Sequence, residues 1–168
     1  MTDPTLIEEL ARAIPVVVGG LLAVGGGLFG QVVTHRLTMK RERSKIQRER
    51  LESFVKAIYA HSQWLDEKRN TMIFANSDHD VASPLDEARM IQALHFPELL
   101  DAILAVQQTQ MPLLDFIGKQ RIARMQNQET WLAAWDNEPY NAAYKQYLLA
   151  VGLATMKCRK VLLALPES

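Results

Sequence analysis

The chain has 168 residues, of which 48% are apolar and 23% are charged. This length accommodates one ordinary domain, or a smaller domain with an appendage, and the apolar fraction excludes a disordered chain. A single cysteine, Cys158, excludes an internal disulfide and a thiolate-rich zinc site. The net charge is zero because 19 basic side chains balance 19 acidic ones, yet these charges are segregated along the sequence.

Residues 1–12 form a short acidic N-terminus, and residues 13–34 form a segment without a single charge. As a helix this segment would be about 33 Å long, which matches a hydrocarbon core of about 30 Å. We therefore predict one transmembrane helix at 13–34. Its acidic leading flank disfavours a signal peptide, and its glycines lack the spacing of a phosphate-binding loop. The remaining alternative is a buried helix of a soluble protein.

Small residues in the predicted span lie four apart on two adjacent faces of the helix. Such spacing lets the backbones of membrane helices approach closely, so we expect the span to pack against other copies and form a homo-oligomer. The alternative is that the glycines only occupy a tolerant membrane anchor. The residues concerned are Gly19, Ala23, Gly26, Gly27, Gly30 and Thr34.

A basic juxtamembrane stalk is predicted at 35–50, where seven cations stand against Glu42 and Glu49, for a net charge of +5. The positive-inside rule then predicts an N-terminus outside the inner (cytoplasmic) membrane and a C-terminal part in the cytoplasm. The same cations suit anionic lipid headgroups, whereas nucleic acid is disfavoured because the run contains no aromatic side chain. The cations are Arg36, Lys40, Arg41, Arg43, Lys45, Arg48 and Arg50.

Residues 51–168 predict an antiparallel helical bundle, which places the chain in the all-α class. No Pro or Gly interrupts the sequence from Arg36 to about Ala75, and a loop is expected at 76–80. Ser83 and Pro84 predict a helix start, and that helix should end before Pro97. The next helix, at 97–125, is expected to bury one apolar face and to bend at Pro112. That face comprises Leu100, Ile103, Leu104, Met111, Leu114, Ile122 and Met125.

The last segment has the most regular pattern, with apolar or aromatic side chains spaced alternately by four and three residues. This heptad spacing predicts a coiled-coil-like seam that faces the bundle or a partner. The seam comprises Tyr140, Tyr144, Tyr147, Val151, Ala154, Cys158, Val161 and Leu165. Because Cys158 lies on it, we expect a buried thiol rather than a nucleophile.

No arrangement of residues predicts a catalytic, cofactor or metal site. The four histidines fall in no metal-binding spacing, and Asp78, His79 and Asp80 are typical of a polar turn. Trp131 and Trp135 are expected to form a core or interface pair. Among the glutamines at 107, 108 and 110, one is expected to lie inside the bundle and to need a partner. We therefore expect no enzyme activity and no cofactor.

The layout of glycine-rich span, basic stalk and small helical domain is similar to that of single-pass bacterial and prophage-type proteins. The similarity covers architecture only, because no motif carries it. It favours a membrane-anchored interaction or scaffold protein that self-associates or holds an unidentified cytoplasmic protein at the bilayer. The alternative is an oligomeric effector that perturbs membranes, of the toxin, phage-lysis or anti-phage type.

Overall fold

The described chain consists of helices joined by loops, which confirms the predicted all-α class. The computed structural model describes the backbone of residues 4–166 and the side chains of residues 34–166, and this part contains no strand. The predicted transmembrane segment at 13–34 lies outside the described side chains, with the exception of Thr34. In the part that is described, no helix combines the length and apolar character needed to cross a membrane.

The first helix, α1, comprises Pro4–Arg69 and continues into a π-helical turn, η1, at Asn70–Phe74. In this turn the N–H of Ala75 donates to the carbonyl of Asn70 at 3.0 Å. The absence of Pro and Gly between Arg36 and Ala75 explains why no break occurs in this stretch. The loop that follows includes the predicted turn at 76–80 and contains Asn76, whose φ of 52° lies in the left-handed region.

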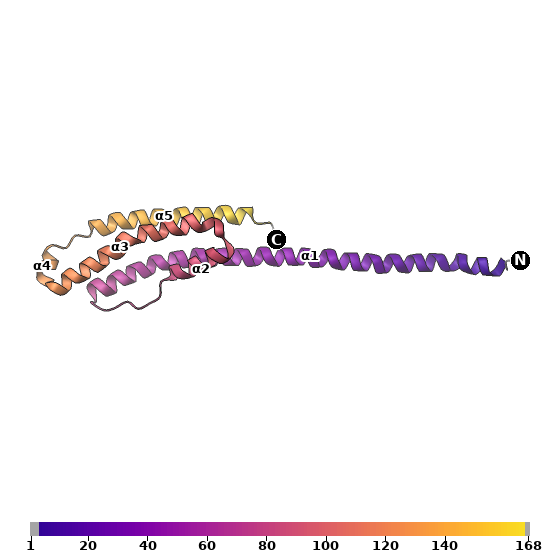
Figure 1. The fold of residues 1–168 in the computed structure, drawn as a ribbon, viewed down its shortest axis with the longest axis horizontal. Coiled ribbons are helices and arrows are strands. Elements are labelled where there is room, and N and C mark those ends of the chain that lie inside the picture. The colour runs from indigo at the N-terminus through magenta and orange to yellow at the C-terminus, as the bar shows by residue number, and fades with distance from the viewer. Residues whose placement is uncertain (1–3, 167–168) are drawn as a thin grey trace. The chain divides into compact units, whose positions relative to one another are not determined.

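The chain divides into two units, one ending at Lys45 and the other comprising Ile46–Pro166. The bundle unit therefore begins a few residues before the predicted boundary at 50/51. Besides the second part of α1, it contains a 3₁₀ turn, η2 (Pro97–Leu99), and four further helices (Figure 1). These are α2 (Pro84–His95), α3 (Leu100–Gln126), α4 (Gln128–Ala133) and α5 (Glu138–Ala164).

Contacts between side chains define the directions of the helices within the bundle. α5 runs antiparallel to α3, because Lys157 pairs with Asp101 while Tyr140 contacts Phe116. It also runs antiparallel to α1, since Tyr147 meets Ser62 and Tyr140 meets Asp66 farther along α1. The bundle is thus held by contacts that are distant in sequence, as expected for packed amphipathic helices.

The start of α2 follows local rules that the sequence makes visible. Ser83 is the N-cap residue, and its hydroxyl accepts a hydrogen bond from the N–H of Leu85 at 3.3 Å. Pro84 occupies the first helical position, where its missing N–H costs nothing. The helix ends at His95, because Phe96 precedes Pro97 and adopts a non-helical conformation with φ −138° and ψ 66°.

The predicted apolar face of α3 is wrong. Of its seven residues only Ile103 is buried and Leu114 half-buried, whereas Leu100, Leu104, Met111, Ile122 and Met125 are exposed. The side chains that face the core lie on the adjacent side of the helix. These are Ile103, Val106, Leu113, Phe116 and Ile117, and Leu99 of η2 is buried beside them. The prediction failed because a polar residue, Gln110, interrupts the inward stripe, whereas large apolar side chains also repeat at helical spacing along the outward side.

The connection between α3 and α5 contains a short helix, α4, that the sequence pattern did not predict. Asn127 is its N-cap, and the side-chain oxygen accepts from the N–H of Thr130 at 3.0 Å. Trp131 is buried and packs edge-on against Trp135 with the ring centroids 5.0 Å apart. The two tryptophans therefore belong to the core at this end of the bundle, where Phe74 joins them.

Candidate functional site

The residues predicted to pack helices together in the membrane fall almost entirely outside the described side chains. This applies to Gly19, Ala23, Gly26, Gly27 and Gly30. The remaining one, Thr34, is exposed, and its carbonyl accepts a hydrogen bond from the hydroxyl of Thr38 at 2.9 Å.

The predicted basic stalk presents most of its charge to solvent. Six of its seven cations are exposed, namely Arg36, Lys40, Arg41, Arg43, Lys45 and Arg50. Arg48 differs because it is half-buried and donates a hydrogen bond from its guanidinium to the carbonyl of Pro166 at 3.3 Å. Arg48 thus contacts the C-terminal end of the bundle unit.

The eight residues of the predicted α5 seam all lie toward the interior of the bundle. Tyr140, Tyr147, Val151, Ala154 and Cys158 are buried, and the other three are half-buried. Burial raises the pKa of the Cys158 thiol to about 11, so the thiol stays protonated at neutral pH. A protonated, buried thiol is a poor nucleophile.

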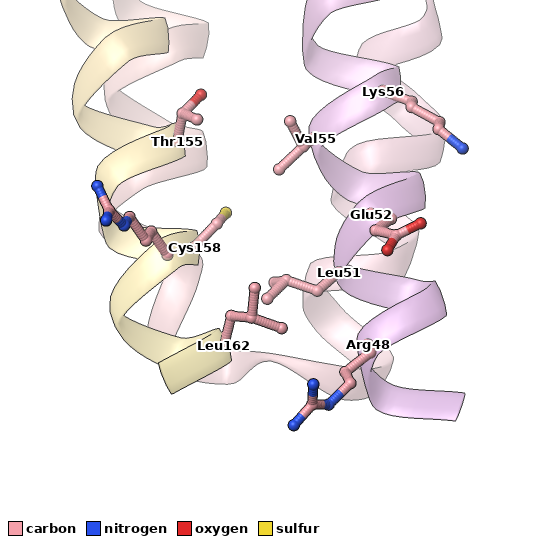
Figure 2. A pocket seen from close by; sticks show the side chains of 9 residues that line it. Arg48, Leu51, Glu52, Val55, Lys56, Thr155, Cys158 and Leu162 are labelled. Atoms are coloured by element: carbon pink, nitrogen blue, oxygen red, sulfur yellow. The ribbon is translucent and has the colours of Figure 1, made fainter. Parts of the chain in front are cut away.

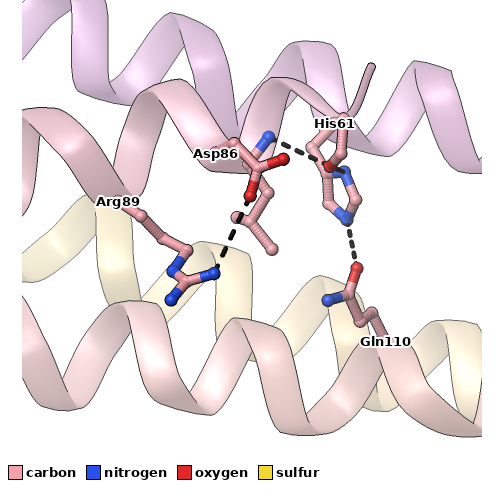
Figure 3. Close-up of polar contacts among 6 residues, drawn as sticks. His61, Asp86, Arg89 and Gln110 are labelled. Carbon is pink, nitrogen blue, oxygen red and sulfur yellow. Dashed lines mark hydrogen bonds and ion pairs between the residues drawn. The ribbon is translucent and has the colours of Figure 1, made fainter. Parts of the chain in front are cut away.

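A buried polar cluster surrounds His61, a residue that the sequence pattern did not single out. His61 is fully buried, and its Nε2 lies 2.7 Å from Oε1 of Gln110 while its Nδ1 lies 3.1 Å from Oγ of Ser83 (Figure 3). Because an amide oxygen can only accept, Nε2 carries the ring hydrogen, and Nδ1 accepts from the hydroxyl of Ser83. Every polar atom of the neutral imidazole is thus satisfied.

This cluster joins three helices of the bundle. His61 comes from α1, Gln110 from α3, and Ser83 caps the start of α2. Of the glutamines at 107, 108 and 110, Gln110 is therefore the one that the sequence analysis expected inside the bundle with a partner. A sequence signal for His61 existed, because it follows Phe54 and Ile58 and precedes Leu65 with heptad spacing, so a histidine occupies a position of the apolar seam.

A second polar cluster lies between α1 and α5. The hydroxyls of Tyr140 and Tyr144 donate to the two carboxylate oxygens of Asp66 at 3.3 and 3.2 Å. The hydroxyl of Tyr147 lies 3.2 Å from that of Ser62. Burial raises the pKa of Tyr147 to about 12. These phenols stay protonated and act as hydrogen-bonding groups of the core.

A groove of about 360 Å³ lies between α1 and α5 at the end of the bundle near Arg48 (Figure 2). Leu51 and Val55 point into it from α1, and Cys158 and Leu162 point into it from α5. Its walls are therefore apolar, while its edges carry charged side chains. These are Arg48 and Arg159, together with Glu52 and Lys56, whose charged ends point away from α5 (Figure 2).

The outer face of α5 carries a second apolar stripe. Leu149, Leu153, Met156 and Leu163 are exposed and repeat at spacings of four, three and seven residues. Between Asn141 and Pro166 the sequence holds Lys145, Lys157, Arg159 and Lys160 but no acidic residue. This surface combines apolar side chains with a net positive charge.

The arrangement of titratable groups offers no metal site in the described part of the chain, where no three His, Cys, Asp or Glu side chains converge. In the loop before α2, Asp78 pairs with Arg121 of α3 at 2.7 Å, and His79 packs against Trp64. The loop thus uses these residues to hold α3 and α1. The chain matches no protein-family model, no curated protein and no solved structure at a significant level.

Proposed function

We propose that this protein is a membrane-anchored, non-enzymatic interaction protein whose helical bundle holds another protein chain at the bilayer. The anchor is the uncharged segment at 13–34, and the basic stalk orients it with the bundle in the cytoplasm. The proposal joins this sequence pattern to one structural observation, the apolar outer face of α5.

The α5 outer stripe carries the proposal because its side chains have no partner within the described chain. Leu149, Leu153, Met156 and Leu163 are 60%, 61%, 56% and 75% exposed. Single exposed apolar residues are common on protein surfaces, but a stripe repeated at heptad spacing along one helix is typical of a helix that packs against another. This spacing favours a helical binding partner.

The charge of the stripe indicates the kind of partner. With four cations and no acid from Asn141 to Pro166, α5 would repel a second α5. A second copy of the chain offers a more complementary face on α2, where Glu87, Met90 and Leu94 are all exposed and share one side of the helix. We therefore propose self-association in which α5 of one copy packs against α2 of the next, supported in the membrane by the small-residue faces of the span.

Chemical crosslinking of the full chain in native membranes tests this association. The double variant L153E/M156E places two carboxylates in the outer stripe and is expected to abolish crosslinks through the bundle. The matched control M111E/M125E places two carboxylates on the exposed face of α3 and is expected to crosslink like the wild type. Equal crosslinking of all three proteins would contradict the proposed interface.

The membrane anchor is tested separately. The intact chain should stay in the membrane fraction after carbonate washing, and a phosphatase fused after Ser168 should be inactive because it would lie in the cytoplasm. The double variant G26L/G30L should insert normally but crosslink less through the span. Release of the chain by carbonate would show that 13–34 does not anchor it.

The alternative function, a membrane-perturbing effector, rests on the six glycines of the span, since close packing of several spans is one way to open a bilayer. Dye leakage from cells expressing the wild type, but not G26L/G30L, would favour this alternative. Intact membranes together with co-purification of a second chain would favour the interaction protein.

A further inference from the structure

The groove between α1 and α5 has the chemistry of a binding site for an anionic amphiphile. Its interior is formed by Leu51, Val55, Cys158 and Leu162, which offer no charged atom to a ligand (Figure 2). Its volume of about 360 Å³ lies in the range of small-molecule sites, about 300–1,000 Å³. An acyl chain would fill this space and cover the exposed parts of Val55 and Leu162.

The charges at the edges of the groove select the headgroup of such a ligand. Arg48 and Arg159 stand on the two helices that form the groove, whereas the charged ends of Lys56 and Glu52 point away from α5 (Figure 2). Arg159 makes no ion pair within the described part of the chain, so its charge is available to a ligand. The excess of positive charge favours an anion.

Arg48 supplies a more specific observation. Its terminal nitrogen donates to the carbonyl of Pro166, but its Nε is buried and has no hydrogen-bond partner among the described residues. A buried donor without a partner is costly, and an acceptor from a ligand would remove that cost. A carboxylate or phosphate oxygen suits a guanidinium, because the pair forms charge-assisted hydrogen bonds.

We infer that this groove binds a ligand with a single acyl chain and an anionic headgroup. The acyl chain lies between α1 and α5, and the headgroup lies at Arg48 and Arg159. The ligand is either a free fatty acid or the chain of an anionic membrane lipid, which share this chemistry. Binding would join the C-terminal end of α5 to the middle of α1 and make the bundle sensitive to the acyl chains available to it. The site does not depend on the α5 outer stripe, which lies on another face of α5.

Photolabelling of the full chain in phosphatidylcholine membranes tests this inference. Three probes carry the same photoreactive acyl chain: a fatty acid, a phosphatidylglycerol and an uncharged fatty alcohol. Mass spectrometry should locate adducts of at least one anionic probe on the peptides containing Leu51, Val55 and Leu162. Which of the two anionic probes labels the groove distinguishes the free acid from the membrane lipid.

Two kinds of variant distinguish labelling in the groove from non-specific labelling elsewhere on the protein. V55W and L162W each fill the groove and should abolish the adducts, while L104W, at an exposed position on α3, should not. R48Q should lower labelling by the anionic probes about tenfold, which corresponds to about 1.4 kcal/mol, and leave labelling by the alcohol unchanged. Circular dichroism of each variant shows whether it is folded, and two groove-filling variants guard against a folding defect in one.

The inference is overturned by any of three results. These are equal labelling of the groove by the alcohol and the anions, adducts that persist in folded V55W and L162W, or adducts confined to the exposed residues of α3 and α5. Because the probes report a location on the bundle, their failure leaves the anchoring and crosslinking experiments unaffected.

Discussion

Acidification should destabilise the bundle through one side chain, His61. Burial lowers the pKa of His61 below its ordinary value of 6.5, and this effect outweighs the hydrogen bond to Gln110 and the attraction of Asp86, which both raise it. The unfolded chain, in which His61 is solvated, therefore binds a proton more readily than the folded chain. Stability is expected to be constant well above pH 6.5 and to fall as the pH drops below it.

The size of this effect follows from the number of protons involved. Between the unfolded and folded pKa values the unfolded state binds up to one more proton than the folded state, so the free energy of unfolding falls by at most about 1.4 kcal/mol per pH unit. The loss ends once the pH is below the folded-state pKa. For a domain with a typical stability of about 5–15 kcal/mol, one such pH unit is a measurable fraction of the total.

Urea unfolding of the full chain in mild detergent, followed by circular dichroism from pH 8 to pH 5, measures this slope. The variant H61Q keeps a neutral hydrogen-bonding side chain that does not titrate, and it should show a shallower decline than the wild type. The control H95Q alters an exposed histidine and should behave like the wild type. If H61Q loses stability with the same slope as the wild type, the assignment of this pH dependence to His61 is wrong.

Three further predictions concern single side chains of the bundle, each measured by the same urea unfolding. Replacing Gln110 by Leu leaves the buried Nε2–H of His61 unpaired and should cost about 1–3 kcal/mol, and adding H61L should recover part of that loss. Leu113→Ala, at a fully buried position, should cost about 2–5 kcal/mol, whereas the exposed Met111→Ala should change stability by less than about 0.5 kcal/mol. Ser83→Ala removes the N-cap of α2 and a donor to His61, and it should cost about 1 kcal/mol or more; no change would contradict the bonding pattern assigned to Ser83.

Features governed by neighbouring residues could be predicted from the sequence. The start of α2 depends on Ser83 and Pro84, and its end depends on Pro97, so capping and steric rules were sufficient. The inward face of α5 was also predictable, because its eight seam positions contain no charged residue and repeat over more than three heptads. α5 also has an outer apolar stripe, but that stripe is shorter than the seam and is interrupted by Lys160.

Features that depend on a distant partner could not be predicted in this way. α3 has apolar side chains on two faces, and only packing against α1 and α5 decides which one is buried. The π-helical turn η1 is a similar case, because Arg124 of α3 donates hydrogen bonds to the carbonyls of Ile73 and Phe74 within it. The groove likewise arises from residues about a hundred positions apart in the sequence, so no local pattern predicts it.

The pair formed by His61 and Gln110 explains how the bundle selects one face of α3. By apolar content alone the outer face, with Leu104 and Met111, is as suitable for burial as the inner one. With that face inward, the imidazole of His61 would lie among apolar side chains without an acceptor for its N–H, at a cost of about 1–3 kcal/mol.

Gln110 removes this cost only when α3 takes its observed orientation, so the pair contributes specificity in the way that single polar residues set register in coiled coils. The double variant H61L/Q110L should therefore stay folded but sample both orientations. Oxidation of the exposed Met111 by peroxide should slow in that variant, because part of the population buries it, while oxidation of Met90 on α2 serves as the control. An unchanged rate at Met111 would mean that packing against α5, rather than this polar pair, fixes the orientation of α3.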